Sequence, residues 1–216
     1  APDAAHPDTE VLERICERAI ARQRGGAVRR GVFVDRDGTL VVERGYLAEA
    51  SGIELLPGSL RAVHDLQAAG FPVIVVSNQS GVGRGLFPLA RVYETMARLR
   101  SVLREGGVEL DGIYFCPHRP EEQCGCRKPG IGLLERAAED HLLSLHGSFV
   151  VGDKRIDVES AQRARARGVL VRSGYGREEE GSWAREGSGA TPDHVCDDLA
   201  AAAAWIISVA EGADLE

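Results

Sequence analysis

Short apolar runs alternate along this chain with longer segments of helical periodicity, and this alternation constrains the fold more than any other feature. The runs are rich in valine, isoleucine and phenylalanine, and we expect strands at 32–34, 71–76, 113–115, 148–151, 169–171 and 194–196. Between them we expect helices at 59–69, 88–104, 131–141, 158–167 and 199–210. Strands that alternate with helices are typical of a parallel sheet covered on both faces. The predicted fold is therefore α/β, with a doubly wound parallel sheet.

A single domain with an N-terminal extension accounts for the 216 residues of the chain. We assign 31–212 to the domain and 1–30 to the extension, where apolar residues recur with helical spacing between about 8 and 24. We expect this helix to pack against the flank of the domain, and a contact between two subunits is the alternative. Segment 41–56 is predicted to be a short flap or hairpin. Segment 173–191, rich in glycine, serine and glutamate, is predicted to be a mobile loop.

The composition argues against several classes of protein. A hydrophobic fraction of 44% with 27% charged residues is typical of a soluble globular domain. The net charge of -7 argues against a broad surface for nucleic acid or anionic membranes. No apolar run reaches the roughly 18 residues that a membrane helix needs, and the N-terminal stretch does not resemble a signal peptide. We therefore expect a cytoplasmic monomer that binds neither nucleic acid nor membranes.

Two carboxylates directly follow the first predicted strand. Asp35 and Asp37 come after the apolar run 32–34, and residues two apart in an extended chain point the same way. Two like charges that lie close together repel, and a divalent cation is a common compensation. With a metal bound, one carboxylate can attack a substrate while the other moves a proton. The alternative is a surface turn, because aspartate and glycine are ordinary turn residues.

Polar and basic residues lie at the ends of other predicted strands and helices. Ser77 ends the second predicted strand, where a hydroxyl and free backbone N–H groups can hold an anionic oxygen. Arg127 and Lys128 precede a predicted helix, whose N-terminal dipole also favours anions. The alternatives are a polar turn and a solvated basic pair. Lys128 and Lys154 are the only lysines in an arginine-rich chain, which indicates a need for a compact point charge at these positions.

Asp153 ends the fourth predicted strand and would lie near the earlier strand ends. In open parallel sheets, ligands bind beyond the carboxyl ends of the strands. Asp35 and Asp153 together would suit a cation that prefers oxygen ligands, such as Mg²⁺. Asp157 comes one helical turn later, and we expect it only to cap the following helix or to support Lys154.

A cluster of sulfur and nitrogen ligands lies in the loop 116–128. Cys116, His118, Cys124 and Cys126 supply the four ligands of a closed tetrahedral zinc site. A closed site has no open position for a substrate, so we expect a structural Zn²⁺ that fixes the loop. Free buried thiols are the alternative, since the spacing differs from that of common zinc fingers.

Four motifs in this order resemble those of the haloacid dehalogenase superfamily of phosphatases: Asp35-Arg36-Asp37-Gly38-Thr39, Ser77-Asn78-Gln79, Lys128-Pro129 and Gly152-Asp153-Lys154. Within this superfamily the chain most resembles the D-glycero-D-manno-heptose 1,7-bisphosphate 7-phosphatases. The resemblance rests on the zinc loop, on Gly-Asp-Lys and on two further stretches, Arg44-Gly45-Tyr46 and Asn78-Gln79-Ser80-Gly81-Val82-Gly83-Arg84-Gly85. Histidinol-phosphate phosphatases share the zinc loop and the first motif, which therefore do not separate the two groups.

The resemblance implies a role for each matching residue. Asp35 would be the nucleophile that forms an aspartyl-phosphate, and Asp37 the general acid and then the general base. Mg²⁺ would be held by Asp35, the backbone carbonyl of Asp37, and Asp153. Ser77 and Lys128 would hold the phosphoryl oxygens. Further contacts to the substrate would come from Gly45, Tyr46, Asn78, Arg84, Arg127 and Lys154.

The implied activity is Mg²⁺-dependent removal of the 7-phosphate from a heptose 1,7-bisphosphate, in the biosynthesis of nucleotide-activated heptose. The resemblance further implies a structural Zn²⁺ and a small-molecule sugar bisphosphate as the binding partner. No large cap domain fits into 40–57 or 78–112, so we expect an open site. The alternatives are a histidinol-phosphate phosphatase and a non-catalytic module that binds sugar phosphates. The presence of both Asp35 and Asp37 favours an enzyme.

Overall fold

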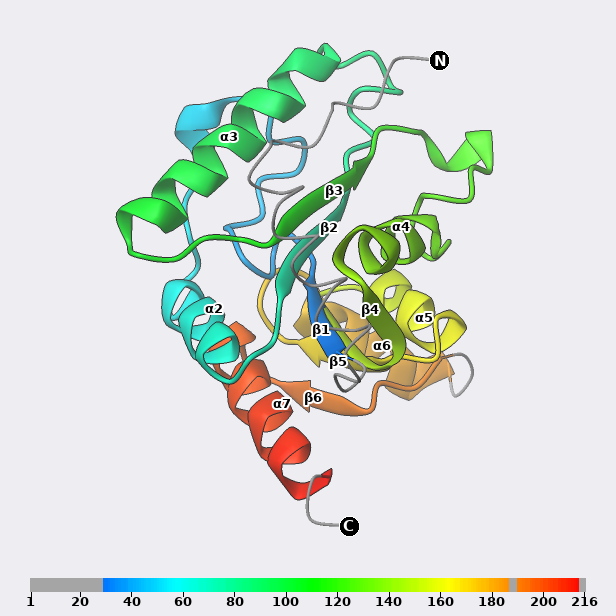
Figure 1. Ribbon diagram of the computed structural model, residues 1–216. Coiled ribbons are helices and arrows are strands. Elements are labelled where there is room, and N and C mark those ends of the chain that lie inside the picture. Colours follow the sequence, from blue (N-terminus) through cyan, green and yellow to red (C-terminus); the bar gives the residue numbers. More distant parts are fainter. Residues whose placement is uncertain (1–28, 187–189, 214–216) are drawn as a thin grey trace.

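A computed structural model describes residues 29–186 and 190–213, so the helix predicted at 8–24 lies outside the described residues. Within them, six parallel strands form one sheet in the order β3-β2-β1-β4-β5-β6 (Figure 1). The strands are β1 (Arg29–Val34), β2 (Val73–Asn78), β3 (Gly112–Cys116), β4 (Leu143–Gly152), β5 (Arg167–Val171) and β6 (His194–Cys196). The predicted doubly wound α/β fold is confirmed. The order reverses between β1 and β4, which places a crevice beyond their carboxyl ends.

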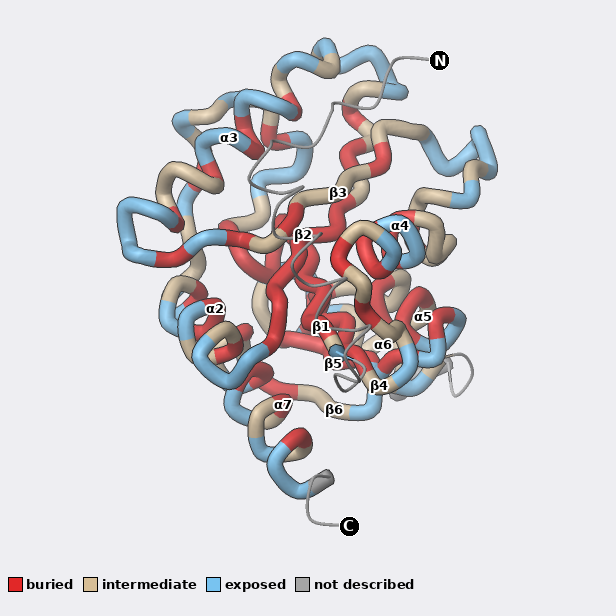
Figure 2. The backbone as a smooth tube through the Cα atoms, viewed as in Figure 1, coloured by how far each residue is buried: buried red, intermediate tan, exposed pale blue. Residues whose placement is uncertain are grey.

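Helices cover both faces of the sheet (Figure 1). Side chains of α2 (Ser59–Ala68), α3 (Leu89–Glu105) and α7 (Leu199–Ala213) join one buried apolar cluster. Side chains of α4 (Gly132–His141) and α5 (Arg155–Arg163) join a second cluster. Burial is concentrated along the strands between these layers (Figure 2).

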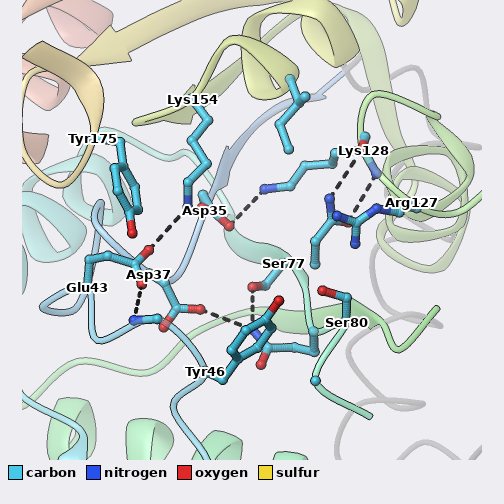
Figure 3. Close-up of a pocket in the computed structure, with 15 residues that line it drawn as sticks. Asp35, Asp37, Glu43, Tyr46, Ser77, Ser80, Arg127, Lys128, Lys154 and Tyr175 are labelled. Atoms are coloured by element: carbon cyan, nitrogen blue, oxygen red, sulfur yellow. Dashed lines mark hydrogen bonds and ion pairs between the residues drawn. The ribbon is translucent and has the colours of Figure 1, made fainter. Parts of the chain in front are cut away.

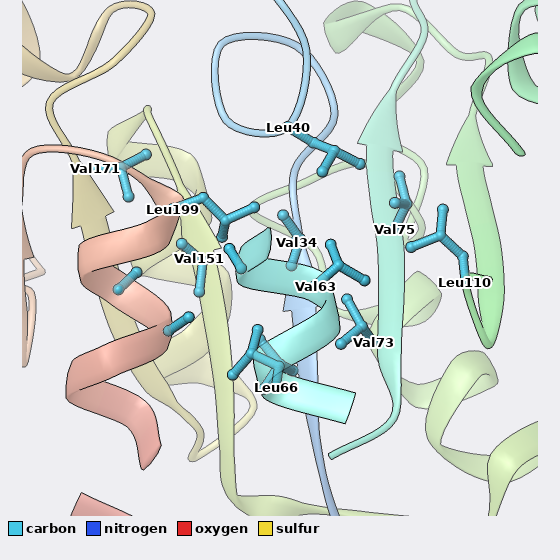
Figure 4. Packing of buried hydrophobic residues seen from close by; sticks show 14 of the residues in the cluster. Val34, Leu40, Val63, Leu66, Val73, Val75, Leu110, Val151, Val171 and Leu199 are labelled. Carbon is cyan, nitrogen blue, oxygen red and sulfur yellow. The ribbon is translucent and has the colours of Figure 1, made fainter. Parts of the chain in front are cut away.

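The first strand shows why the apolar runs are continuous. Val32 and Val34 belong to the first cluster and Phe33 to the second, and all three are fully buried. Successive strand residues point to opposite faces, so a strand between two helical layers needs apolar residues at every position. Figure 4 shows Val34 packing with the side chains of α2, including Val63. Covered on both faces, β1 is a rigid support for the carboxylates that follow it.

The segment predicted as a mobile loop contains a helix, α6 (Gly176–Glu186), and this prediction is wrong for that part. The sequence of α6 is polar, which favours a loop. The helix is nevertheless attached to the end of β5 by an ion pair between Arg172 and Glu180 at 2.7 Å. Amino-acid composition does not predict such a contact. The segment 41–56 contains an antiparallel bridge between Val41 and Leu55 and the short 3₁₀ helix η1 (Ala50–Gly52), as expected for a flap.

Element boundaries differ from prediction mainly around the fourth strand. β4 begins at Leu143, five residues early, because its first residues pair with the start of β1. Helix α5 begins at Arg155, three residues early, where the side chain of Asp157 accepts a hydrogen bond from the backbone N–H of Lys154. A second 3₁₀ helix, η2 (Pro120–Glu122), lies in the cysteine-rich loop. None of the helices in the described ranges is both long enough and apolar enough to cross a membrane.

Candidate active site

A cavity of about 380 Å³ opens at the carboxyl ends of β1 and β2 and beside the loop after β4. The side chains that line it come from segments far apart in the sequence (Figure 3). Nine of the residues predicted for catalysis or substrate binding line it: Asp35, Asp37, Gly45, Tyr46, Ser77, Asn78, Arg127, Lys128 and Lys154. Asp153 is fully buried and does not line the cavity.

Three buried carboxylates lie close together at this edge of the sheet. One carboxylate oxygen from each of Asp35, Asp153 and Asp157 lies within 4.8 Å of the others. Oδ2 of Asp153 accepts a hydrogen bond from the backbone N–H of Tyr175 at 2.9 Å, whereas Oδ1 is buried without a hydrogen-bond partner among the described residues. Burial and the charge of Asp35 raise the pKa of Asp153 to about 8. An orphaned buried oxygen among carboxylates fits a cation such as Mg²⁺.

Two glycines make room for the side chain of Asp153. Gly38 and Gly174 have φ values of +81° and +53°, in the left-handed region that favours glycine. A Cβ atom at either position would lie 2.2 Å from Oδ2 of Asp153. Gly38 belongs to the first motif, but the role of Gly174 was not predicted because it depends on a contact between distant loops.

Lys128 pairs with two of these three carboxylates, Asp35 and Asp157. Its Nζ donates to Oδ1 of Asp35 at 2.7 Å and to the carbonyl of Val76 at 2.8 Å, and lies 2.6 Å from Oδ1 of Asp157. Burial alone would lower the pKa of Lys128, but the two carboxylates outweigh it and raise that pKa. Asn78 fixes the backbone of Lys128, with its side-chain amide donating to the Lys128 carbonyl at 3.2 Å and accepting from its N–H at 3.1 Å.

Asp157 does more than the sequence indicated. Its Oδ2 accepts from the backbone N–H of Lys154 at 3.2 Å, which is the expected capping contact. Its Oδ1 forms the ion pair with Lys128, so Asp157 also helps to place that lysine. Burial raises the pKa of Asp157 to about 6, although the charge of Lys128 opposes this shift. In the sequence, only the spacing of four residues from Asp153 pointed to Asp157. Its partner Lys128 lies in another loop, so the ion pair could not be predicted.

The side chain of Asp37 is held by two residues that the sequence did not single out as functional. Arg36 donates to both carboxylate oxygens at 3.0 Å, and Gln79 donates to Oδ2 at 3.0 Å. The same amide of Gln79 donates to Oγ of Ser77 at 2.8 Å, so it connects the first two motifs. Burial raises the pKa of Asp37, and the nearby charge of Arg36 opposes this rise.

The outer part of the cavity contains Glu43 and Tyr175, which the sequence analysis also missed. Nζ of Lys154 donates to Oε2 of Glu43 at 3.1 Å and lies 4.8 Å from the centre of the Tyr175 ring (Figure 3). The backbone N–H of Gly45 donates to Oε1 of Glu43 at 2.6 Å. Tyr46 is 52% exposed at the rim. The flap therefore contacts the loop after β4 across the mouth of the cavity.

The two arginines predicted to contact the substrate lie in different surroundings. Arg127 lines the cavity and donates to the backbone carbonyl of His118 at 3.3 Å, which attaches it to the cysteine-rich loop. Arg84 is exposed and does not line the cavity. Its role in substrate binding stays a prediction.

The four predicted zinc ligands converge. Three S–S separations among Cys116, Cys124 and Cys126 are 3.3–3.6 Å, and Nδ1 of His118 lies 3.4 Å from Sγ of Cys116 and 3.3 Å from Sγ of Cys126. Ligands around a tetrahedral zinc lie about 3.5–3.8 Å apart, given Zn–S and Zn–N bonds of about 2.3 and 2.0 Å. Burial raises the pKa of Cys116 and of Cys126, whereas for Cys124 burial is outweighed by hydrogen bonds, first from Cys126, which lower the pKa to about 7. The residues fit Zn²⁺.

Comparison with known proteins gives a consistent family. A family model described as HAD-hydrolase-like matches residues 125–202. The D-glycero-D-manno-heptose-1,7-bisphosphate 7-phosphatase of Thermosynechococcus vestitus is 40% identical over 190 residues, which cover 82% of this chain and 95% of that protein. The D-glycero-beta-D-manno-heptose-1,7-bisphosphate 7-phosphatase of Pseudomonas putida is 40% identical over 146 residues, covering 67% and 83%.

A solved structure agrees with these relatives. The crystal structure of D,D-heptose 1,7-bisphosphate phosphatase from B. bronchiseptica, complexed with magnesium and phosphate, has a TM-score of 0.75 and 32% identity. The alignment covers 83% of this chain and 99% of that one. Together with the strand-end motifs, these matches show that the chain belongs to the D-glycero-D-manno-heptose-1,7-bisphosphate 7-phosphatase family of the haloacid dehalogenase-like hydrolases.

Proposed function

We propose that this chain is a Mg²⁺-dependent phosphatase that removes the 7-phosphate from D-glycero-D-manno-heptose 1,7-bisphosphate. The observation that carries the proposal is the position of Asp35. Its carboxylate lines the cavity, lies next to the ammonium of Lys128 and belongs to a cluster of oxygens that suits a divalent cation. We infer the identity of the sugar from the names of the relatives. The cavity offers both acidic and basic side chains that can bind it.

The first chemical step transfers the phosphoryl group to the protein. A carboxylate oxygen of Asp35 attacks phosphorus, and the bond from phosphorus to the sugar oxygen breaks. A proton from Asp37 goes to that oxygen, so the sugar leaves as an alcohol and Asp35 carries the phosphoryl group. Ser77 and Lys128 hold the phosphoryl oxygens, which carry negative charge throughout the transfer.

The second step releases the phosphate. Water attacks phosphorus, Asp37 takes a proton from that water, and the bond from phosphorus to the Asp35 oxygen breaks. Inorganic phosphate leaves, with Asp35 ionised and Asp37 protonated as at the start. Asp35, Asp153 and the backbone carbonyl of Asp37 would hold Mg²⁺, and the ion would neutralise charge on the transferring group.

The remaining contacts suit a substrate with a second anionic group. Arg127 and Lys154 line the same cavity as the nucleophile, and either cation can pair with the other phosphate. Tyr46 lies at the rim, where its ring can cover a sugar face. Zn²⁺ at the cysteine cluster would fix the loop that carries Arg127 and Lys128.

A direct comparison of substrates tests the proposal. Phosphate release with Mg²⁺ is measured from both anomers of the heptose bisphosphate, from fructose 1,6-bisphosphate and from histidinol phosphate. We expect a preference of tenfold or more for one heptose anomer, which corresponds to about 1.4 kcal/mol in the transition state. A preference for histidinol phosphate, or no turnover at all, would contradict the proposed substrate. Asp35→Asn should abolish turnover without unfolding the protein.

A further inference from the structure

Arg36 is the largest fully buried side chain among the described residues and lies between the two motif carboxylates in the sequence. It is 1% exposed. Removing an unpaired guanidinium from water costs several kcal/mol, so buried arginines persist where their nitrogens are matched. Nε of Arg36 donates to both oxygens of Asp37 at 3.0 Å, and Nη2 lies 2.8 Å from Oδ2. The guanidinium is therefore aligned with the carboxylate.

The other side of the guanidinium is fixed to rigid parts of the fold. Nη1 donates to Oγ1 of Thr95 at 3.2 Å, and this hydroxyl in turn donates to the carbonyl of Val92 within α3. Nη2 donates to Oε1 of Gln79 at 3.1 Å. All three nitrogens of Arg36 thus have partners, and the side chain has one well-defined orientation.

These contacts treat the two oxygens of Asp37 differently. Oδ2 accepts from Arg36 and from Nε2 of Gln79, which occupies the two acceptor directions of a carboxylate oxygen. Within the described part of the chain, Oδ1 accepts from Arg36 alone. Oδ1 therefore keeps one acceptor direction, and it is the oxygen available to exchange a proton with a substrate or water.

We propose that Arg36 is a positioning residue that, together with Gln79, fixes the orientation of Asp37 so that Oδ1 faces the oxygen of the leaving sugar. The inference rests on the proposed function and adds a residue that acts through Asp37 rather than on the substrate. It assigns a task to a buried charge that the phosphoryl-transfer steps do not otherwise use.

The leaving group provides the test. For a sugar phosphate, the departing oxygen needs the proton of Asp37; p-nitrophenolate departs without one. kcat/KM reports the steps up to formation of the aspartyl-phosphate. For Arg36→Met we expect kcat/KM to fall by about 100-fold with the heptose bisphosphate, as for loss of general acid catalysis. With p-nitrophenyl phosphate the fall should be at least tenfold smaller.

Controls separate positioning from general damage. Arg36→Lys keeps the charge but cannot contact both oxygens and Gln79 together, so it should give a smaller loss in the same direction. If the methionine variant shows no cooperative unfolding transition, the comparison between substrates is made with Arg36→Lys instead. Arg100→Met, on the same helix as Thr95, removes only a half-buried arginine bonded to the carbonyl of Leu110, and should leave the ratio between substrates unchanged.

Equal losses with both substrates in the folded Arg36 variant would overturn the inference. Failure of the proposed substrate is a separate outcome, because it is seen in the wild-type protein. In that case the ratio is measured with whichever alkyl phosphate the wild-type protein hydrolyses, and the same criterion applies.

Discussion

The raised pKa of Asp153 predicts that the proposed binding of Mg²⁺ depends on pH near neutrality. The side chain is fully buried, its Oδ1 has no hydrogen-bond partner among the described residues, and burial with the charge of Asp35 raises its pKa to about 8. The cation requires the ionised form, so protons compete with Mg²⁺ below this pH. We therefore expect the affinity for Mg²⁺ to be lost as the pH falls through about 8.

The magnitude follows from the fraction of Asp153 that is ionised. With a pKa of about 8, roughly half of the metal-free protein has ionised Asp153 at pH 8 and about 1% at pH 6. The apparent Kd should therefore weaken by about 50-fold, or about 2.3 kcal/mol, over these two pH units. The stability of the metal-free protein depends on pH in the opposite direction to its affinity for Mg²⁺. The folded state without metal binds more protons than the unfolded chain between about pH 4 and pH 8, so its stability falls as the pH rises through this window.

Titration calorimetry of the metal-free protein with MgCl₂ at pH 6, 7 and 8 measures the affinity. Two buffers with different ionisation enthalpies at each pH count the protons released, and about 0.9 per Mg²⁺ is expected at pH 7. Asp153→Asn is the control, and its residual binding should show little dependence on pH. A Kd that changes less than threefold between pH 6 and 8, with no proton release, would refute the assigned protonation of Asp153.

Two further perturbations test the supports of the site. Lys128→Met leaves Asp35 and Asp157 buried without their cation and should destabilise the metal-free protein by about 3–5 kcal/mol in urea unfolding; adding Asp157→Asn should recover a large part of the loss, and no recovery would argue against the ion pair. Cys124→Ser should remove bound zinc, measured by elemental analysis against about one zinc per wild-type chain, and should lower kcat by loosening Arg127. Wild-type protein prepared without chelators that contains no zinc would disprove the zinc assignment.

Much of the fold could be predicted because its causes are local. The strands between two helical layers need apolar residues at every position, and such runs are visible in the sequence. The carboxyl ends of those strands meet at one edge, so the polar residues after them could be expected to converge. Asp35, Asp37 and Ser77 line one cavity for this reason. The convergence of the four side chains of the candidate zinc site could be predicted because they lie within eleven residues of one another.

The features that were missed depend on contacts between distant segments. Asp157 has a local role as a helix cap, which the sequence indicated, and a distant one as partner of Lys128, which it did not. Arg36 has partners just after β2 and on α3, at separations of 43 and 59 residues. Helix α6 is polar along most of its length, and no periodic apolar pattern marks it. In each case the missing information was which distant segments lie side by side.

The presence of only two lysines in an arginine-rich chain predicts a need for a compact charge at 128 and 154, and the structure shows a different setting for each. An ammonium has three donors in a compact head, whereas a guanidinium is planar and larger. Nζ of Lys128 donates hydrogen bonds to Asp35 and to the carbonyl of Val76 and forms an ion pair with Asp157 at 2.6 Å, and so compact a set of partners suits an ammonium. Lys154 has a looser setting, with Glu43 at 3.1 Å and Asp153 at 3.8 Å. The setting of Lys128 therefore favours a compact ammonium, whereas Lys154 lines the cavity with one side-chain hydrogen bond among the described residues, to Glu43, and keeps donors for the substrate contact that we propose for it.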